Sequence, residues 1–87
     1  MARHDYAAYE RDLQAMSTDD LNREAVLKFT RHLWNRLHGQ AVIESRRLVA
    51  CLQLEFRRRD EDMEPAVEEA RRIHREENAI KNNVLPR

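Results

Sequence analysis

Histidine and cysteine are the side chains of this 87-residue chain best suited to metal binding or nucleophilic chemistry. Metal ligands on one helix must lie three or four residues apart to share a face. His32 and His38 are six residues apart, and no carboxylate completes a set on their face. His74 with Glu77 or Asn78 supplies too few ligands. We therefore expect no metal site and no cofactor.

Other catalytic arrangements are equally poor in this sequence. Acidic pairs occur at 19–20, 68–69 and 76–77, but adjacent helix positions diverge by about 100° and do not converge on one substrate. Gly39 is the only glycine, which excludes a glycine-rich phosphate loop. Cys51 lies in an apolar run and is expected to be a small buried hydrophobe. We expect a protein that is not an enzyme.

Charge is balanced over the whole chain but is unevenly distributed along it. Residues 1–20 carry a net charge of −3, residues 21–59 carry +6, and residues 60–87 carry −3. The simplest interpretation is that the acidic arms fold back and neutralise the basic centre. A single cysteine cannot form an intramolecular disulfide, and the segment Met1–Met16 has no continuous apolar run. These features predict a cytoplasmic protein with no signal peptide, membrane anchor or membrane partner.

The elements that must position any functional residue are helices. One glycine, two prolines and abundant Ala, Leu, Glu, Gln and Arg indicate an all-α protein. Hydrophobic periodicity and capping residues predict a single domain, 1–87, that forms a small bundle of three or four helices. The predicted helices span 5–16, 19–38, 41–59 and 64–81, with a frayed tail at 82–87.

The central segment 21–59 is expected to be one long, kinked helix or two helices separated at Gly39. A glycine just past a helix end favours a turn. Against a turn, Gln40 is a poor N-cap, and a lone glycine costs a helix only about 1 kcal/mol. A turn predicts a compact bundle with Trp34 in its core. A continuous helix would expose so much apolar surface that dimerisation would be needed.

Two apolar faces are expected on each half of this segment. In the first half, one face carries Val26, Phe29, Leu33 and Leu37, and a neighbouring ridge carries Leu27, Arg31, Trp34 and His38. In the second half, one face carries Val42, Val49, Leu52 and Phe56, and a second face on nearly the opposite side carries Ile43, Ala50 and Leu54. Two thin flanking helices cannot cover all of this surface, so some of it should remain for a partner.

We therefore expect a protein that binds a larger protein or complex, as a regulator, adaptor or inhibitor. Trp and Arg are enriched at binding hot spots. The predicted partner-binding residues are Leu27, Arg31, Trp34, His38, Ile43, Arg47, Ala50 and Leu54. Small helical proteins of this class include phage- and mobile-element-encoded inhibitors, which is an analogy of class only. A homodimer is a further expectation.

Two alternatives use charge. A nucleic-acid-binding regulator, or one with an acidic partner, would use the arginines of the centre, namely Arg46, Arg47, Arg57, Arg58 and Arg59. An inhibitor of a basic surface would use the acidic run of Asp60, Glu61, Asp62 and Glu64. Helix-end electrostatics explains part of both groups, because cations favour the end of one helix and anions the start of the next.

Overall fold

The structure is a computed structural model that describes residues 5–84. Four helices account for most of them: α1 (Tyr6–Ala15), α2 (Thr18–His38), α3 (Val42–Arg58) and α4 (Glu64–Val84). The predicted all-α bundle is confirmed. Helix α4 continues through Asn82 and Asn83, where the sequence had predicted its end. The predicted fraying of residues 85–87, and the first four residues of the N-terminal segment, lie outside the described residues.

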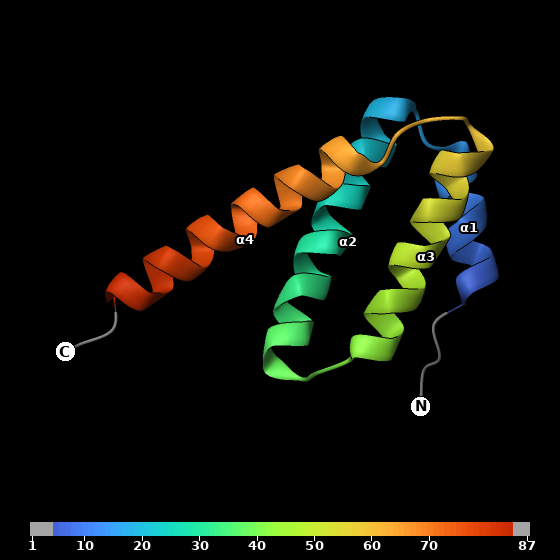
Figure 1. Cartoon of the computed structure of the whole chain (residues 1–87). Helices are drawn as coiled ribbons and strands as arrows, with labels where there is room; N and C mark the ends of the chain where they lie inside the picture. The colour runs from blue at the N-terminus through green and yellow to red at the C-terminus, as the bar shows by residue number, and fades with distance from the viewer. Residues whose placement is uncertain (1–4, 85–87) are drawn as a thin grey trace.

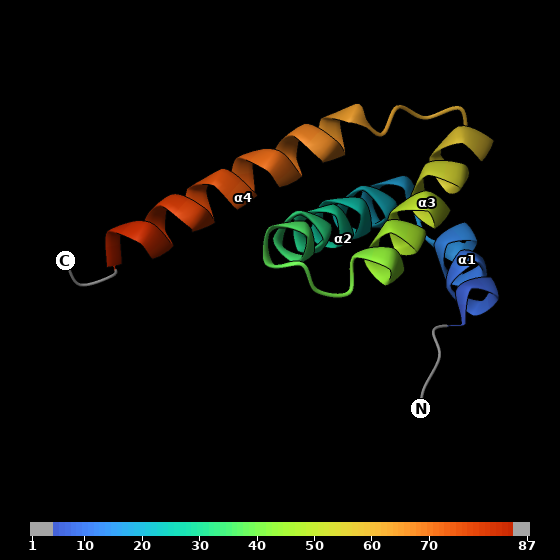
Figure 2. The ribbon, with the colours of Figure 1, turned by 60° about the horizontal axis from the view of Figure 1, so that its bottom comes forward.

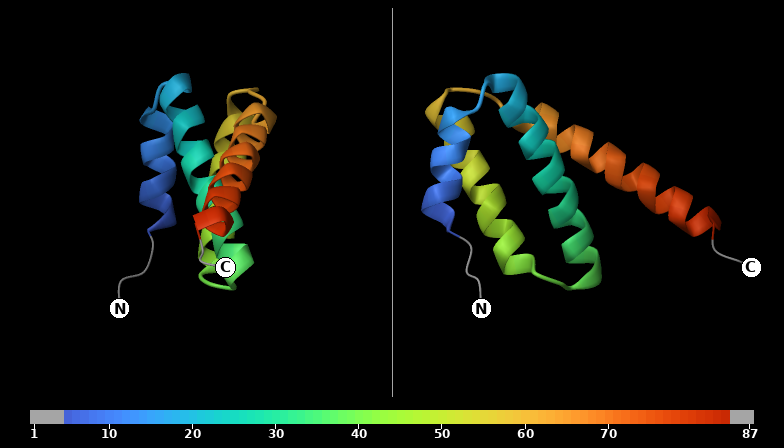
Figure 3. Two further views of the ribbon diagram at one scale, coloured as in Figure 1. Left: turned by 90° about the vertical axis from the view of Figure 1, so that its left-hand side faces the viewer. Right: turned by 180° about the vertical axis from the view of Figure 1, so that it is seen from behind.

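The helices pack in the spatial order α1, α3, α2, α4 (Figure 1). Helices α2 and α4 start at the same end of the molecule and run in the same general direction, whereas α1 and α3 run the opposite way (Figures 1 and 3). Figure 2 shows α4 on one side of α2, with α3 and α1 on the other. The Cα atoms span 48 × 34 × 15 Å, so the bundle is thin and its helices have large exposed faces.

Gly39 ends α2, and the turn is therefore the correct alternative. Its φ of 67° is left-handed, and the amide of Gln40 donates to the carbonyl of Asn35 at 2.9 Å. The Gly39 amide donates a hydrogen bond to the carbonyl of Arg36 at 3.4 Å, which completes a Schellman motif. At the other end of α2, Ser17 accepts a hydrogen bond from the Asp20 amide at 3.1 Å, as a capping serine does.

Helix α3 starts without help from a capping side chain. Its N-cap residue is Ala41, which has a φ of 48° and makes no side-chain hydrogen bond. A residue with a Cβ pays a steric cost in this conformation. Asp60, just after α3, is also left-handed, with a φ of 56°, and aspartate tolerates that region better. The shortage of a good N-cap near Gln40 is thus real, and α3 forms in spite of it.

The core lies at the end of the molecule where α1 and α3 finish and α2 and α4 begin. Leu13, Leu21 and Leu52 are fully buried there. The remaining buried members of this cluster are Ala25, Cys51, Phe56 and Ala66. Residues from all four helices therefore meet in a single cluster, which holds the thin bundle together.

The predicted apolar face of α2 is only partly covered, because Val26, Phe29 and Leu33 are half-buried and Leu37 is exposed. The buried residues of α2 are Leu21, Ala25 and His32, whereas Leu37 is 58% exposed. Helix α4 diverges from α2 toward its C-terminal end (Figures 1 and 2), so the last turn of α2 has little to pack against. None of the helices in the described part of the chain is long and apolar enough to cross a membrane.

Candidate protein-binding groove

A groove follows one side of the contact between α2 and α4. It consists of two hollows of about 640 and 430 Å³ that share Val26, Leu27 and Ile73. We call it the α2–α4 groove. Its α2 wall carries Arg23, Leu27, Arg31 and Trp34, and its α4 wall carries Ala66, Glu69, Ile73 and Glu77. The larger hollow is mainly apolar, so the groove offers a hydrophobic surface between a basic wall and an acidic wall.

Leu27 is a large, exposed apolar side chain of the α2–α4 groove. It is 65% exposed, whereas Val26 beside it is half-buried and packs against the core. Complete burial of a leucine is worth about 1.5–3 kcal/mol relative to exposure. A partner that covers Leu27 would therefore gain binding free energy that the isolated chain does not use.

Trp34 closes one end of the α2–α4 groove and attaches α4 to α2. Its Nε1 donates to the Glu77 carboxylate at 3.0 Å, and its ring meets the His74 ring edge-on at 4.5 Å between centroids. The Lys81 ammonium lies 5.5 Å from the Trp34 ring centroid. On its own helix, Trp34 stacks on His38 at 5.7 Å. Trp34 is half-buried, so it is not the core residue that a bundle with a turn predicts.

Glu77 has a structural role in these contacts. The carboxylate accepts the indole hydrogen bond in place of an apolar contact. His74 is less well satisfied, because its Nε2 is buried and no other group in the described part of the chain bonds to it. The polar contacts at this end of the groove therefore leave one buried acceptor or donor unused.

The predicted partner-binding residues fall into two groups on different helices. Leu27, Arg31 and Trp34 line the α2–α4 groove, and His38 stacks on the last of them. The other four, Ile43, Arg47, Ala50 and Leu54, lie on α3, opposite its buried side, and all of them are exposed. The structure therefore does not combine the eight residues into one site.

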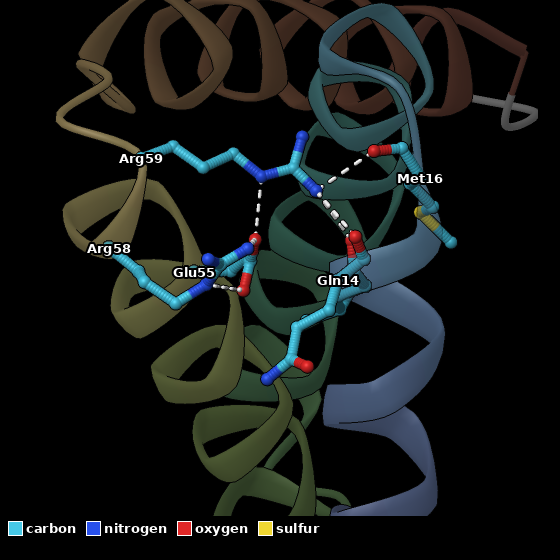
Figure 4. A network of polar contacts seen from close by, with 6 residues as sticks. Gln14, Met16, Glu55, Arg58 and Arg59 are labelled. Carbon is cyan, nitrogen blue, oxygen red and sulfur yellow. Dashed lines mark hydrogen bonds and ion pairs between the residues drawn. The ribbon is translucent and has the colours of Figure 1, made fainter.

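The arginines proposed for nucleic-acid binding are also divided. Arg58 and Arg59 both donate to Glu55, with Arg58 Nε 3.0 Å from Oε1 and Arg59 Nε 2.6 Å from Oε2 (Figure 4). Arg59 Nη2 continues to the carbonyls of Leu13 and Met16, each at 2.8 Å, and so caps the end of α1. These two arginines therefore have structural partners.

Glu55 is the polar residue that sequence reasoning missed. It is only 5% exposed, and hydrogen bonds from Arg58, with those from Arg59, lower its pKa to about 2. A signal was available, because Glu55 is followed by arginines three and four residues later, a spacing that favours ion pairs on a helix. What the sequence could not show was that Arg59 also reaches α1.

The remaining arginines and the acidic run are exposed. Arg46 and Arg57 are exposed, and the Arg47 guanidinium lies 5.6 Å from the Tyr6 ring centroid. In the acidic run, Asp62 accepts a hydrogen bond from the Glu64 amide at 2.9 Å and so caps α4. Arg58 and Arg59 pair with Glu55 rather than with the acidic run, which leaves Asp60 and Glu61 exposed to solvent.

The candidate reactive side chains Cys51 and His32 are buried, and each lies beside a polar side chain of another helix. Burial raises the pKa of the Cys51 thiol, and its Sγ lies 3.7 Å from the Glu10 carboxylate. His32 Nδ1 lies 2.6 Å from Ser45 Oγ, and burial lowers the pKa of this histidine. Among the described residues, no three His, Cys, Asp or Glu side chains gather in a way that could hold a metal ion.

Comparisons with protein-family models, with curated proteins and with solved structures gave no match to this chain.

Proposed function

We propose that this protein acts by binding other proteins, and that the α2–α4 groove takes up a helix of the partner. The observation that carries the proposal is the exposure of Leu27, 65%, on the α2 wall of a mainly apolar groove. Recognition of an amphipathic helix by a hydrophobic groove is a recurring binding mode, in which anchor residues enter from one helical face.

The dimensions of the α2–α4 groove suit this mode. Its α2 wall extends from Asn22 to Asn35, which corresponds to about 20 Å along a helix. A partner helix of about 13 residues would match that length. Arg31 on the α2 wall could orient it by charge, and Trp34 would lie beside its end.

This mode of action agrees with a role as a regulator, adaptor or inhibitor, because each of these requires only occupancy of a partner's surface. The nucleic-acid alternative is less well supported. Two of its five arginines hold Glu55, and Arg59 also caps α1.

The proposal is tested with a matched pair of substitutions on α2. Leu27→Asp alters the groove, and Leu37→Asp alters a leucine of similar exposure, 58%, that does not line it. Helical peptides of about 13 residues are selected from a displayed library against the unmodified protein, and their affinities for the variants are measured by fluorescence anisotropy.

We expect the selected peptides to bind the unmodified protein and the Leu37→Asp variant equally and to lose roughly tenfold or more in affinity for Leu27→Asp. Emission from Trp34, the only tryptophan, should change on binding because its ring borders the groove. Equal losses in the two variants, or selected peptides that ignore both, would refute the groove as the binding site.

A further inference from the structure

The outward side of α3 carries a regular row of exposed residues that the α2–α4 groove does not use. Ile43, Arg47, Ala50, Leu54 and Arg57 follow one another at spacings of four, three, four and three. This spacing places them along one side of a helix, as at the seam between two packed helices. Ile43 is 70% exposed and Leu54 is 56% exposed, although large apolar side chains usually favour burial. We call this row, together with Arg46, the α3 stripe.

The small side chain of Ala50 lies midway along the α3 stripe. Ile43 precedes it by seven residues and Leu54 follows it by four, so two apolar anchors flank a position where a partner's backbone could approach closely. The buried residues Val49, Leu52 and Phe56 point to the other side of α3. The stripe can therefore bind a partner without disturbing the core.

The charged residues of the α3 stripe are all arginines, and an acidic side chain of α1, Glu10, shares a small hollow with Leu54. Arg46, Arg47 and Arg57 are exposed along it. The two acidic residues of α3 lie elsewhere, since Glu55 is buried and Glu44 lines a recess against Lys28 and Arg31 of α2. The acidic run lies beyond the C-terminal end of α3 and limits the basic stripe there.

The positive charge of the α3 stripe favours one kind of binding partner over a second copy of the chain or nucleic acid. A two-fold pairing of the stripe with a second copy would place the arginines of both copies in one interface, where like charges oppose association. Nucleic acid would pair with the arginines but would leave Ile43 and Leu54 without an apolar counterpart. A helix that carries apolar residues on one face and Asp or Glu beside them complements both features.

We infer that the α3 stripe is a docking surface for an acidic amphipathic helix of a partner protein. Ile43 and Leu54 supply apolar anchors, Ala50 allows close approach, and Arg46 and Arg47 pair with the partner's carboxylates. With the α2–α4 groove on another helix pair, the chain would carry two binding surfaces and could bridge two proteins. This surface is independent of the groove, because the two share no residue.

The test uses two synthetic helical peptides of about 15 residues with the same leucine stripe. One carries glutamates beside the stripe and the other carries lysines. A DNA duplex of about 20 base pairs serves as the nucleic-acid probe. Binding is measured by fluorescence anisotropy at low and high salt for the unmodified protein, Ile43→Ser/Leu54→Ser, Arg46→Gln/Arg47→Gln, and the groove variant Leu27→Ser.

We expect the acidic peptide to bind roughly tenfold or more tightly than the basic one and to weaken at high salt. Both α3 double variants should lose roughly tenfold in affinity for it, and Leu27→Ser should lose nothing. Since all substituted side chains are exposed, circular dichroism should show unchanged folding.

Three results would overturn the inference. One is a lack of preference for the acidic peptide. Another is tight duplex binding that survives Ile43→Ser/Leu54→Ser and disappears with Arg46→Gln/Arg47→Gln, which would identify a nucleic-acid surface. A third is a dimer, measured by light scattering, that Ile43→Ser/Leu54→Ser converts to monomer. A result at Leu27 bears only on the α2–α4 groove, so the two proposals can fail separately.

Discussion

The two ends of the molecule differ in how much of their apolar surface is buried and in how many of their polar groups are hydrogen-bonded. At the closed end, where α1 and α3 finish, Leu13, Leu21 and Leu52 are fully buried, and Arg59 joins Glu55 to the last carbonyls of α1. At the open end, where α2 finishes and α4 diverges, Leu37 and Ile80 are 58% and 62% exposed. The closed end contains the buried residues that stabilise the fold, and the open end exposes apolar side chains to solvent.

This difference shows how a thin chain can carry apolar surface and still fold. Stability gathered in one cluster leaves other faces available for contacts with partners. At the open end, the half-buried Trp34 contacts Glu77 and His74 of α4. The Nε2 of His74 is buried there and has no hydrogen-bond partner among the described residues.

Replacement of Glu55 by alanine should have the largest effect. The substitution leaves Arg59, whose side chain is 16% exposed, beside α1 without its carboxylate. Loss of one member of a buried ion pair should lower the free energy of unfolding by about 3 kcal/mol. The measurement is urea unfolding followed by circular dichroism. Glu69→Ala is the control, because Glu69 pairs with Arg72 on the surface of α4, and its loss should cost less than about 0.5 kcal/mol. Equal costs would mean that the closed end has no special role.

Acid should also destabilise the closed end, by less than the substitution of Glu55 by alanine does. The pKa of Glu55 is lowered from 4.5 to about 2, so its contribution to stability is complete above pH 4.5 and is lost as the pH falls toward 2. Between about pH 5 and 3 the free energy of unfolding should fall by roughly 2 kcal/mol more in the unmodified protein than in Glu55→Gln. Parallel pH profiles for the two proteins, measured by urea unfolding, would contradict this assignment.

Removal of Trp34 should have the smallest and most local effect. Trp34→Ala deletes the ring between His38 and His74 and the hydrogen bond to Glu77, at a cost of about 1.5 kcal/mol for a half-buried aromatic residue. Hydrogen exchange measured by mass spectrometry should become faster in residues 73–81 and change little in residues 49–56. Uniformly faster exchange would show that the two ends unfold together.

The sequence was most informative about individual helices. The predicted bounds lie within three residues of those observed, because Ser17 and Gly39 are local signals that act over one turn. The choice at Gly39 stayed open because Gln40 and Ala41 are unsuited to start a helix. The structure solves that problem with a left-handed alanine, which sequence rules disfavour.

The sequence was less informative about which face each helix presents. Leu37 belongs to the same stripe as Val26, and only the divergence of α4 decides that it stays exposed. The ridge containing Leu27 and Trp34 was identified from its spacing, but its role as the wall of a groove depends on Ile73 and Glu77 of α4. Long-range partners of this kind are not encoded in local periodicity.

The bond from Arg59 to the carbonyl of Leu13 joins residues 46 positions apart and has a consequence for biosynthesis. Helix α1 leaves the ribosome before α3, yet a ten-residue helix is marginal without a docking surface. Its last carbonyls gain their partner only after the end of α3 has been synthesised and has folded. Helix α1 is therefore synthesised early but docks onto α3 only later. During that interval its apolar side is exposed to chaperones or to premature contacts.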